Sequence, residues 1–150
     1  MIRSPIARTV PVTESERPPR AALNRKLAEL LGWTDIQAAG FSLMGTPPWW
    51  AGNSRGQAMV PDWEGSWAAC GPLMVRHGCY PSDDWDDTAS IHVEYASFPG
   101  GEKYSGVDVD VRDYGSKDEA ARAAVVLAAI AQMECAGGEV WRRQLAAAAR

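Results

Sequence analysis

Residues 90–112 read SIHVEYASFPGGEKYSGVDVDVR, and this stretch decides the fold. Apolar and polar residues alternate along 90–97 and again along 104–112, which is typical of two strands that each have one buried face. The Gly-rich turn FPGGEK joins them, so the pattern predicts a β-hairpin. Its two apolar rows reach the same face only if the numbers of paired residues add up to an even value, about 200 or 202.

The segment after the hairpin predicts a long helix over 117–134. Ser116 and Glu119 have the spacing of an S-x-x-E capping box, and alanine and larger apolar residues leave the helix almost no polar face. We therefore expect it to be buried against the hairpin, in an α+β domain whose small antiparallel sheet is sandwiched by helices. The same excess of apolar surface predicts a homo-oligomer, most simply a dimer.

Two further helices are expected on the N-terminal side of the hairpin. Leucines at helical spacing favour one over 20–31. A second is expected to begin at Pro61-Asp62 and to end at His77-Gly78, where His77 would favour the negative end of the helix dipole. Its buried stripe would comprise Trp63, Trp67, Cys70 and Met74. Between the two helices, residues 34–61 have turn chemistry and little periodicity, so we expect no regular structure there.

These elements predict one domain with two appendages. Residues 1–19 are polar, Pro-rich and basic, which predicts an extended arm that is either disordered or crosses to a neighbouring subunit. Residues 20–136 are expected to form the single domain that a chain of 150 residues can fold by itself. Gly137-Gly138 should end the long helix, and residues 137–150 are expected to form a C-terminal helical extension that carries Trp141.

Composition restricts the classes of function. The formal net charge of −4 and the pI near 5.1 give no basic excess that would support nucleic-acid binding. The three cysteines form no CxxC pair, so neither a disulfide framework nor a zinc site is expected. The sequence has no signal-peptide core and no apolar run of membrane-spanning length. We therefore expect a cytoplasmic protein with no membrane partner and no cofactor.

Seven tryptophans are present, and four of them fall in the Gly/Pro-rich stretch 49–67. A large indole with one N–H can fill a small core or wall a binding pocket, and the residues alone leave both interpretations open. In a pocket, stacked indoles and nearby polar side chains would hold a flat ligand that carries phosphate groups. The candidate ligand-binding residues are Trp49, Trp50, Asn53, Arg55, Trp63 and Trp85.

The hairpin predicts a second candidate site. When its valines share one face, the opposite face carries His92, Glu94, Asp108 and Asp110, with one aspartate directly across from His92. One imidazole and three carboxylates could bind a divalent cation or supply an acid–base pair. The same alternation is also typical of an ordinary solvated sheet face, so we assign no metal ligand and no catalytic residue from this pattern alone.

Three stretches carry a resemblance to a known family: LNRKLAELLGW at 23–33, PDWEGSWAACGPLM at 61–74 and SKDEAARAAVVLAAI at 116–130. In this order around an alternating hairpin, they resemble the phage ABA sandwich family of small phage-encoded proteins. The matching signals are Leu23-Asn24, Gly32-Trp33, Pro61-Asp62-Trp63 and the run from Ala120 to Ala131. The resemblance covers residues 20–135 and implies helix/sheet/helix layering and a phage origin. The family has no settled activity, so it supplies no catalytic residue.

Together, the resemblance and the tryptophan cluster favour a phage accessory protein in the cytoplasm of the host cell. It would bind a small nucleotide-type ligand and could sequester a host defence signal without catalysis. Two alternatives stay open. One is an adaptor or inhibitor that docks a host protein through exposed tryptophan. The other is a metal-assisted hydrolase that uses the His92, Glu94, Asp108 and Asp110 face.

Overall fold

The computed structural model describes residues 20–50, 56–83, 89–100, 104–135 and 137–148. The elements run in the order α1 (Arg20–Leu30), β1 (Thr34–Ala39), β2 (Ser42–Thr46), the 3-10 helix η1 (Pro48–Trp50), β3 (Ala58–Met59), α2 (Trp67–His77), β4 (Pro81–Asp83), β5 (Ser90–Ala96), β6 (Tyr104–Asp110), the 3-10 helix η2 (Val111–Asp113), α3 (Lys117–Glu134) and α4 (Gly138–Ala148).

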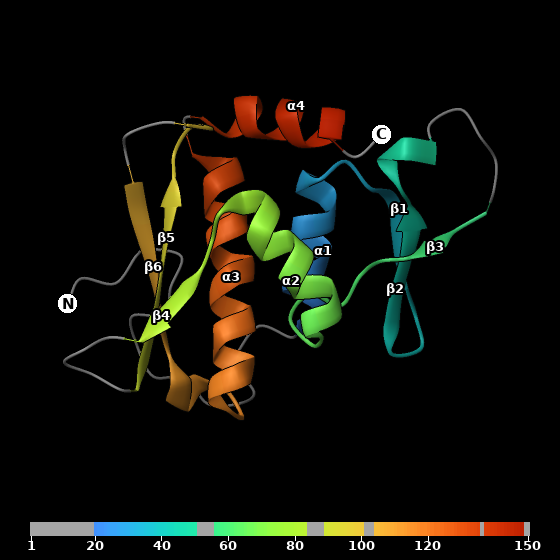
Figure 1. The fold of residues 1–150 in the computed structure, drawn as a ribbon. Coiled ribbons are helices and arrows are strands. Elements are labelled where there is room, and N and C mark those ends of the chain that lie inside the picture. The colour runs from blue at the N-terminus through green and yellow to red at the C-terminus, as the bar shows by residue number, and fades with distance from the viewer. Residues whose placement is uncertain (1–19, 51–55, 84–88, 101–103, 136, 149–150) are drawn as a thin grey trace.

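The elements stack in layers around α3, which confirms the α+β class (Figure 1). The antiparallel sheet β4-β5-β6 lies on one side of α3, and α1 and α2 lie on the other. A second antiparallel sheet, β1-β2-β3, lies beyond α1 and α2, and α4 crosses one end of α3. The layering arises because α3 is apolar around most of its surface and needs partners on every side.

The predicted hairpin is confirmed, including its register. β5 pairs with β6 so that each pair of residue numbers adds up to 200, as in Ser90 with Asp110. Ile91, Val93 and Val107 are consequently buried against α3. A third strand, β4, pairs with β5. It includes Ser82 and Asp83, the first two residues of the acidic stretch SDDWDDT at 82–88.

The long helix is also confirmed, and its N-cap forms as expected. The hydroxyl of Ser116 accepts a hydrogen bond from the backbone N–H of Glu119 at 3.1 Å. The side chain of Glu119 in turn accepts from the N–H of Gly115 at 2.8 Å. From Ala120 to Met133, α3 contacts β5, β6, α1, α2 and α4 of the same chain. The apolar surface of this helix therefore gives no reason to expect an oligomer, and the oligomeric state stays a prediction.

The second helix begins later than the sequence predicts. The carboxylate of Asp62 accepts a hydrogen bond from the N–H of Gly65 at 3.0 Å and another from the amide of Asn24 at 2.8 Å. These contacts close a turn at the position where a helix was expected, and Ser66 becomes the N-cap of α2. Trp63 is buried in this turn, ahead of the helix. The helix ends at His77 as predicted, with Gly78 in the left-handed conformation.

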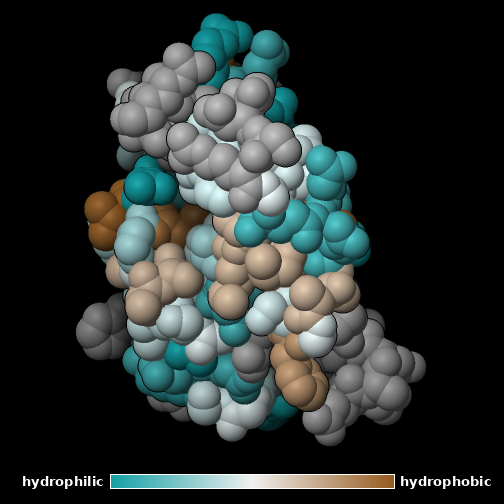
Figure 2. Space-filling model, turned by 90° about the vertical axis from the view of Figure 1, so that its right-hand side faces the viewer, coloured by the Kyte–Doolittle hydropathy of each residue, from teal (hydrophilic) through white to brown (hydrophobic). Residues whose placement is uncertain are grey.

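The prediction that 34–61 lacks regular structure is wrong. β1 and β2 form a hairpin around Gly40, whose φ of 64° suits a tight turn. β1 is exposed along nearly its whole length and its pairing with β2 is irregular, so its sequence carries no alternation of apolar and polar residues. Figure 2 views the molecule from the side of this sheet and shows apolar residues, in tan and brown, among hydrophilic residues in teal.

The C-terminal helix packs on the core through Trp141. This indole is buried, and its Nε1–H donates to the carbonyl of Ala96 at the end of β5, at 3.1 Å. The predicted arm 1–19 lies outside the described residues. None of the helices that the structure describes has the length and apolar character needed to cross a bilayer.

Candidate functional site

A cavity of about 380 Å³ lies where α1, η1, α2 and α4 meet. Its size falls in the range of pockets that hold small molecules. Apolar and aromatic side chains form most of its wall, and three basic side chains complete it. The lining residues are Leu31, Trp33, Pro48, Trp49, Pro61, Trp63, Ala68, Ala69, Pro72, Leu73, Arg76, His77 and Arg142.

The aromatic part of the wall depends on how the chain leaves α1. Gly32 has a φ of 97°, which turns the chain so that Trp33 points back into the core. A Cβ at Gly32 would lie 3.2 Å from the ring of Pro48, so this glycine also lets η1 approach closely. Trp49 then packs edge-on against Trp33, with ring centroids 5.6 Å apart and an interplanar angle of 82°.

Two of the indoles in the wall are buried donors that have no acceptor among the described residues. Trp33 and Trp63 are each only 6% exposed. Within the part of the chain that the structure describes, neither indole N–H donates to a protein atom. Buried polar groups in native proteins nearly always have a hydrogen-bond partner. The two N–H groups are therefore candidates for contact with a ligand in the cavity that they line.

His77 adds a buried acceptor to the same cavity. Its side chain is 2% exposed, and Nδ1 lies 2.8 Å from Oε1 of Gln132 on α3. Among the described residues, no protein group lies within hydrogen-bond distance of Nε2. The sequence predicted His77 as a favourable partner of the helix C-terminus. The structure instead places the imidazole inside the core, where burial lowers its pKa from 6.5, and the neighbouring charge of Arg76 lowers it further.

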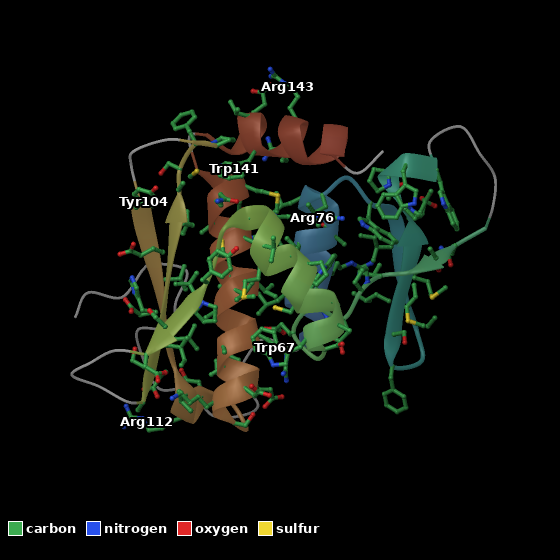
Figure 3. The ribbon with its side chains drawn as sticks, viewed as in Figure 1. Trp67, Arg76, Tyr104, Arg112, Trp141 and Arg143 are labelled. Atoms are coloured by element: carbon green, nitrogen blue, oxygen red, sulfur yellow. The ribbon has the colours of Figure 1, made fainter. Side chains whose placement is uncertain are left out.

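Two arginines supply positive charge at the cavity. Arg76 lies on α2, one residue before His77, and Figure 3 shows it near the end of α2 on the side of α4. It is exposed, and its side chain makes no hydrogen bond or ion pair with a described residue. Arg142, from α4, donates through one terminal nitrogen to the carbonyl of Met133 at 2.6 Å. No aspartate or glutamate is among the described lining residues, so the cavity favours an anion.

The structure brings together only part of the predicted ligand site. Trp49 and Trp63 line the cavity, while Trp50 does not. Asn53, Arg55 and Trp85 lie outside the described residues. In the cavity, the positive charge comes from Arg76 and Arg142.

Sequence reasoning missed Trp33, Arg76, His77 and Arg142 as parts of this site. The sequence placed His77 at the end of a helix and Arg142 in the C-terminal extension, and it gave Trp33 and Arg76 no role in a site. One sequence feature pointed to two of these residues. Arg76 and His77 are consecutive at the end of a helix that begins near the tryptophan cluster. That signal is weak because basic residues are common in the last turn of any helix.

The face of the hairpin that carries His92 forms ion pairs within itself. His92 lies directly across from Asp108, as the register predicted, and its Nδ1 is 2.8 Å from Oδ1 of that aspartate. Its Nε2 is 3.7 Å from the carboxylate of Glu94. Arg112 donates to both carboxylate oxygens of Asp110, at 3.0 and 2.7 Å. The described part of the chain contains no group of three or more His, Cys, Asp or Glu side chains arranged to hold a metal ion.

Ser82, His92 and Asp108 form a row across the three strands of this sheet, yet they do not form a nucleophile relay. The hydroxyl of Ser82 donates to the backbone carbonyl of His92 at 3.3 Å. The imidazole lies over Gly106 on β6, where an added Cβ would come within 2.5 Å of Cε1. A relay needs a serine that donates to the histidine ring, and this geometry does not provide it.

Comparison of the chain with protein-family models, with curated proteins and with solved structures gave no match. The phage ABA sandwich resemblance therefore stays a prediction from the sequence. The cavity and the groups in its wall are the structural basis for a functional proposal.

Proposed function

We propose that the protein binds a small, flat, anionic ligand of nucleotide type in the cavity between α1, η1, α2 and α4, and that it does so without catalysis. The observation that carries the proposal is the combination of groups in one cavity wall. Trp33 and Trp63 with their buried indoles, His77 with its buried imidazole, and two arginines all line the same volume. Water could satisfy single groups of this kind, but the set as a whole matches a ligand with a planar apolar body and polar edges.

The aromatic wall suits a nucleobase. Trp49 is 53% exposed at the mouth of the cavity, while Trp33 and Trp63 are buried deeper. A base that stacks on such an indole gains about 1–3 kcal/mol. The volume of about 380 Å³ is suited to a mononucleotide.

The arginines suit the phosphate of the same ligand. Arg76 is exposed, and no described residue uses the N–H groups of its guanidinium, so they are available to an anion. A guanidinium can hold a phosphate through two parallel hydrogen bonds. The protein as a whole is acidic, so the positive charge at the cavity is local.

The chemistry of the wall supports binding without turnover. Apart from His77, the described lining residues include no serine, threonine, cysteine, aspartate, glutamate or lysine. No nucleophile or second acid–base group among them therefore stands beside the imidazole. If the phage origin implied by the resemblance holds, such a protein would sequester a nucleotide signal of the host's defence.

The proposal is tested by titrating the protein with adenosine, guanosine, cytidine and uridine monophosphates and with their cyclic forms. Tryptophan fluorescence and calorimetry would report binding. We expect Arg76→Gln to weaken binding about tenfold or more, and Arg143→Gln to leave it unchanged. Arg143 is the matched control, because it points outward from α4 (Figure 3) and pairs with Glu139 at 3.2 Å. If no nucleotide alters the fluorescence or produces heat, the proposal is wrong.

One observation favours the adaptor as a second candidate function. Phe41, at the tip of the β1-β2 hairpin, is fully exposed, and Met59 on β3 of the same sheet is largely exposed. Exposed apolar side chains of this size are typical of protein interaction sites when they form a patch. The double variant Phe41→Ser/Met59→Ser should abolish binding to a host protein and leave nucleotide binding intact. Loss of nucleotide binding in that variant would argue against two separate surfaces.

A further inference from the structure

We infer that Nε2 of His77 accepts a hydrogen bond from the ligand and thereby favours a base that presents an N–H donor at its edge, such as the amino group of adenine, over a base without one. This inference rests on the proposed nucleotide binding and adds the chemical class of the base. It depends on three features of the structure: the tautomer of His77, the rigidity of its ring and the surroundings of Nε2.

The tautomer is set by the hydrogen bonds of Gln132. Its amide nitrogen donates to the carbonyl of His77 at 3.1 Å and to the carbonyl of Ala96 at 3.2 Å. These two acceptors fix the orientation of the amide, so that its oxygen faces Nδ1 of His77 at 2.8 Å. A carbonyl oxygen only accepts. Nδ1 therefore carries the hydrogen, and in the neutral ring Nε2 carries a lone pair.

The ring cannot easily turn away from this orientation. His77 stacks on Trp141 of α4, and the indole of Trp141 donates to the same Ala96 carbonyl that Gln132 uses. Reversal of the Gln132 amide would place its oxygen against two carbonyl oxygens and lose both hydrogen bonds. The protein thus holds one tautomer and one orientation before any ligand binds.

Because Nε2 has no donor among the described residues, we expect its hydrogen-bond partner to be a ligand in the cavity. No described protein group donates to it, and His77 lines the cavity together with the indoles of Trp33 and Trp63. The pKa of the imidazole is lowered by burial, which keeps the ring neutral and the lone pair available at neutral pH. A buried acceptor without a donor raises the free energy of the complex. A ligand that supplies a donor should therefore bind more tightly than one that does not.

The ligand preference is tested with two probes that differ by one amino group. Adenosine monophosphate carries the 6-amino group, and purine riboside 5′-monophosphate lacks it. We expect the first to bind about tenfold more tightly, which corresponds to one hydrogen bond. His77→Phe should remove this preference, because it keeps an aromatic ring beside Trp141 but has no acceptor.

His92→Phe is the matched control. It removes the other histidine of the chain, which also has an Nδ1 contact of 2.8 Å, here with Asp108. His92 is not among the residues that line the cavity. This variant should keep both the binding and the preference of the wild type. A similar loss of preference in both variants would overturn the inference.

A measurement on the wild-type protein keeps the inference testable if His77→Phe does not fold. With only two histidines in the chain, 15N-histidine labelling gives two imidazoles that variants can assign. We expect the Nδ1–H tautomer at His77, and a shift of its Nε2 resonance on addition of adenosine, cytidine or guanosine monophosphate, while His92 does not change.

The outcomes separate the two proposals. If nucleotides quench tryptophan fluorescence but the His77 resonances do not move, nucleotide binding stands and the role of His77 is wrong. An Nε2–H tautomer in the free protein would also overturn that role. If no nucleotide quenches the fluorescence, the proposed function fails and this inference fails with it.

Discussion

The imidazole of His77 lies nearly parallel to the indole of Trp141, with ring centroids 6.3 Å apart and an interplanar angle of 19°. This stack joins the end of α2 to α4, and the hydrogen bond from Trp141 to Ala96 joins α4 to β5. Figure 3 shows Trp141 between α4 and the end of α3. The C-terminal helix is therefore packed on the core and closes one side of the cavity through Arg142.

The first prediction concerns this packing. Trp141→Ala should lower the free energy of unfolding by about 3–5 kcal/mol, because it removes a buried aromatic ring and leaves a void. Urea denaturation measures the loss. Val140→Ala, at the neighbouring exposed position on the same helix, is the control and should change stability by less than about 1 kcal/mol. Equal losses in the two variants would mean that α4 does not pack as described.

The second prediction concerns pH. The folded-state pKa of His77 is lowered from 6.5 by burial, so near neutral pH neither the folded nor the unfolded state binds the proton. As the pH falls below about 6.5, the unfolded chain binds a proton that the folded protein does not, and stability is lost. The hydrogen bond to Gln132 raises the pKa of His77 in part, whereas the neighbouring charge of Arg76 opposes protonation along with burial.

We therefore expect the wild type to lose stability between pH 7 and about pH 5.5 more steeply than His77→Phe. Urea denaturation of both proteins at each pH gives the difference between their free energies of unfolding. The contribution of the carboxylates is the same in both proteins and drops out of this difference. Parallel profiles would contradict a buried neutral imidazole at this position.

The third prediction separates the two tryptophans of the predicted site. Trp63→Ala should cost about 3–5 kcal/mol of stability because the ring is buried. Trp49→Ala should cost about 1 kcal/mol, the value of its edge-on contact with Trp33, and should weaken nucleotide binding through lost stacking. Thermal denaturation and calorimetry measure the two effects. A Trp49→Ala protein with unchanged affinity would remove Trp49 from the binding wall.

The fourth prediction compares two glycines. A Cβ at Gly71, inside α2, would meet no atom within 4 Å, so Gly71→Ala should stabilise the protein by about 0.5–1 kcal/mol through helix propensity. A Cβ at Gly137 would collide with the carbonyl oxygen of Ser97. Gly137→Ala should therefore destabilise the protein. Denaturation curves in which both variants shift the same way would contradict this close approach.

The fifth prediction concerns thiol chemistry. Burial raises the pKa of the Cys70 thiol to about 11 and that of Cys79 to about 12. Because the thiolate is the reactive form, neither should react with iodoacetamide in the native protein at neutral pH, and both should react after unfolding. Mass spectrometry of the labelled peptides reports this. Rapid native labelling of Cys70 would show that α2 opens from the core.

The sequence by itself determined the hairpin and α3. Strand alternation has a period of two residues, so burial of one face allowed only an even register, and Ser90 pairs with Asp110 accordingly. The α3 sequence has a capping box at one end and almost no polar face, and both features favour a buried helix. Both signals are local, which is why they could be read from one sequence.

Tertiary structure alone decided the second sheet, the start of α2 and the cavity. β1 is exposed and so carries no alternation, while Asp62 forms a turn because Asn24, from a distant helix, donates to it. The cavity wall takes residues from the turn after α1, from η1, from the turn before α2, and from α2 and α4. Their meeting depends on how four elements pack, and no periodicity within any one of them encodes it. Trp49 and Trp63 could be predicted from their type, whereas Arg142 could be found only once α4 was seen to pack near the end of α2 through the stack of Trp141 on His77.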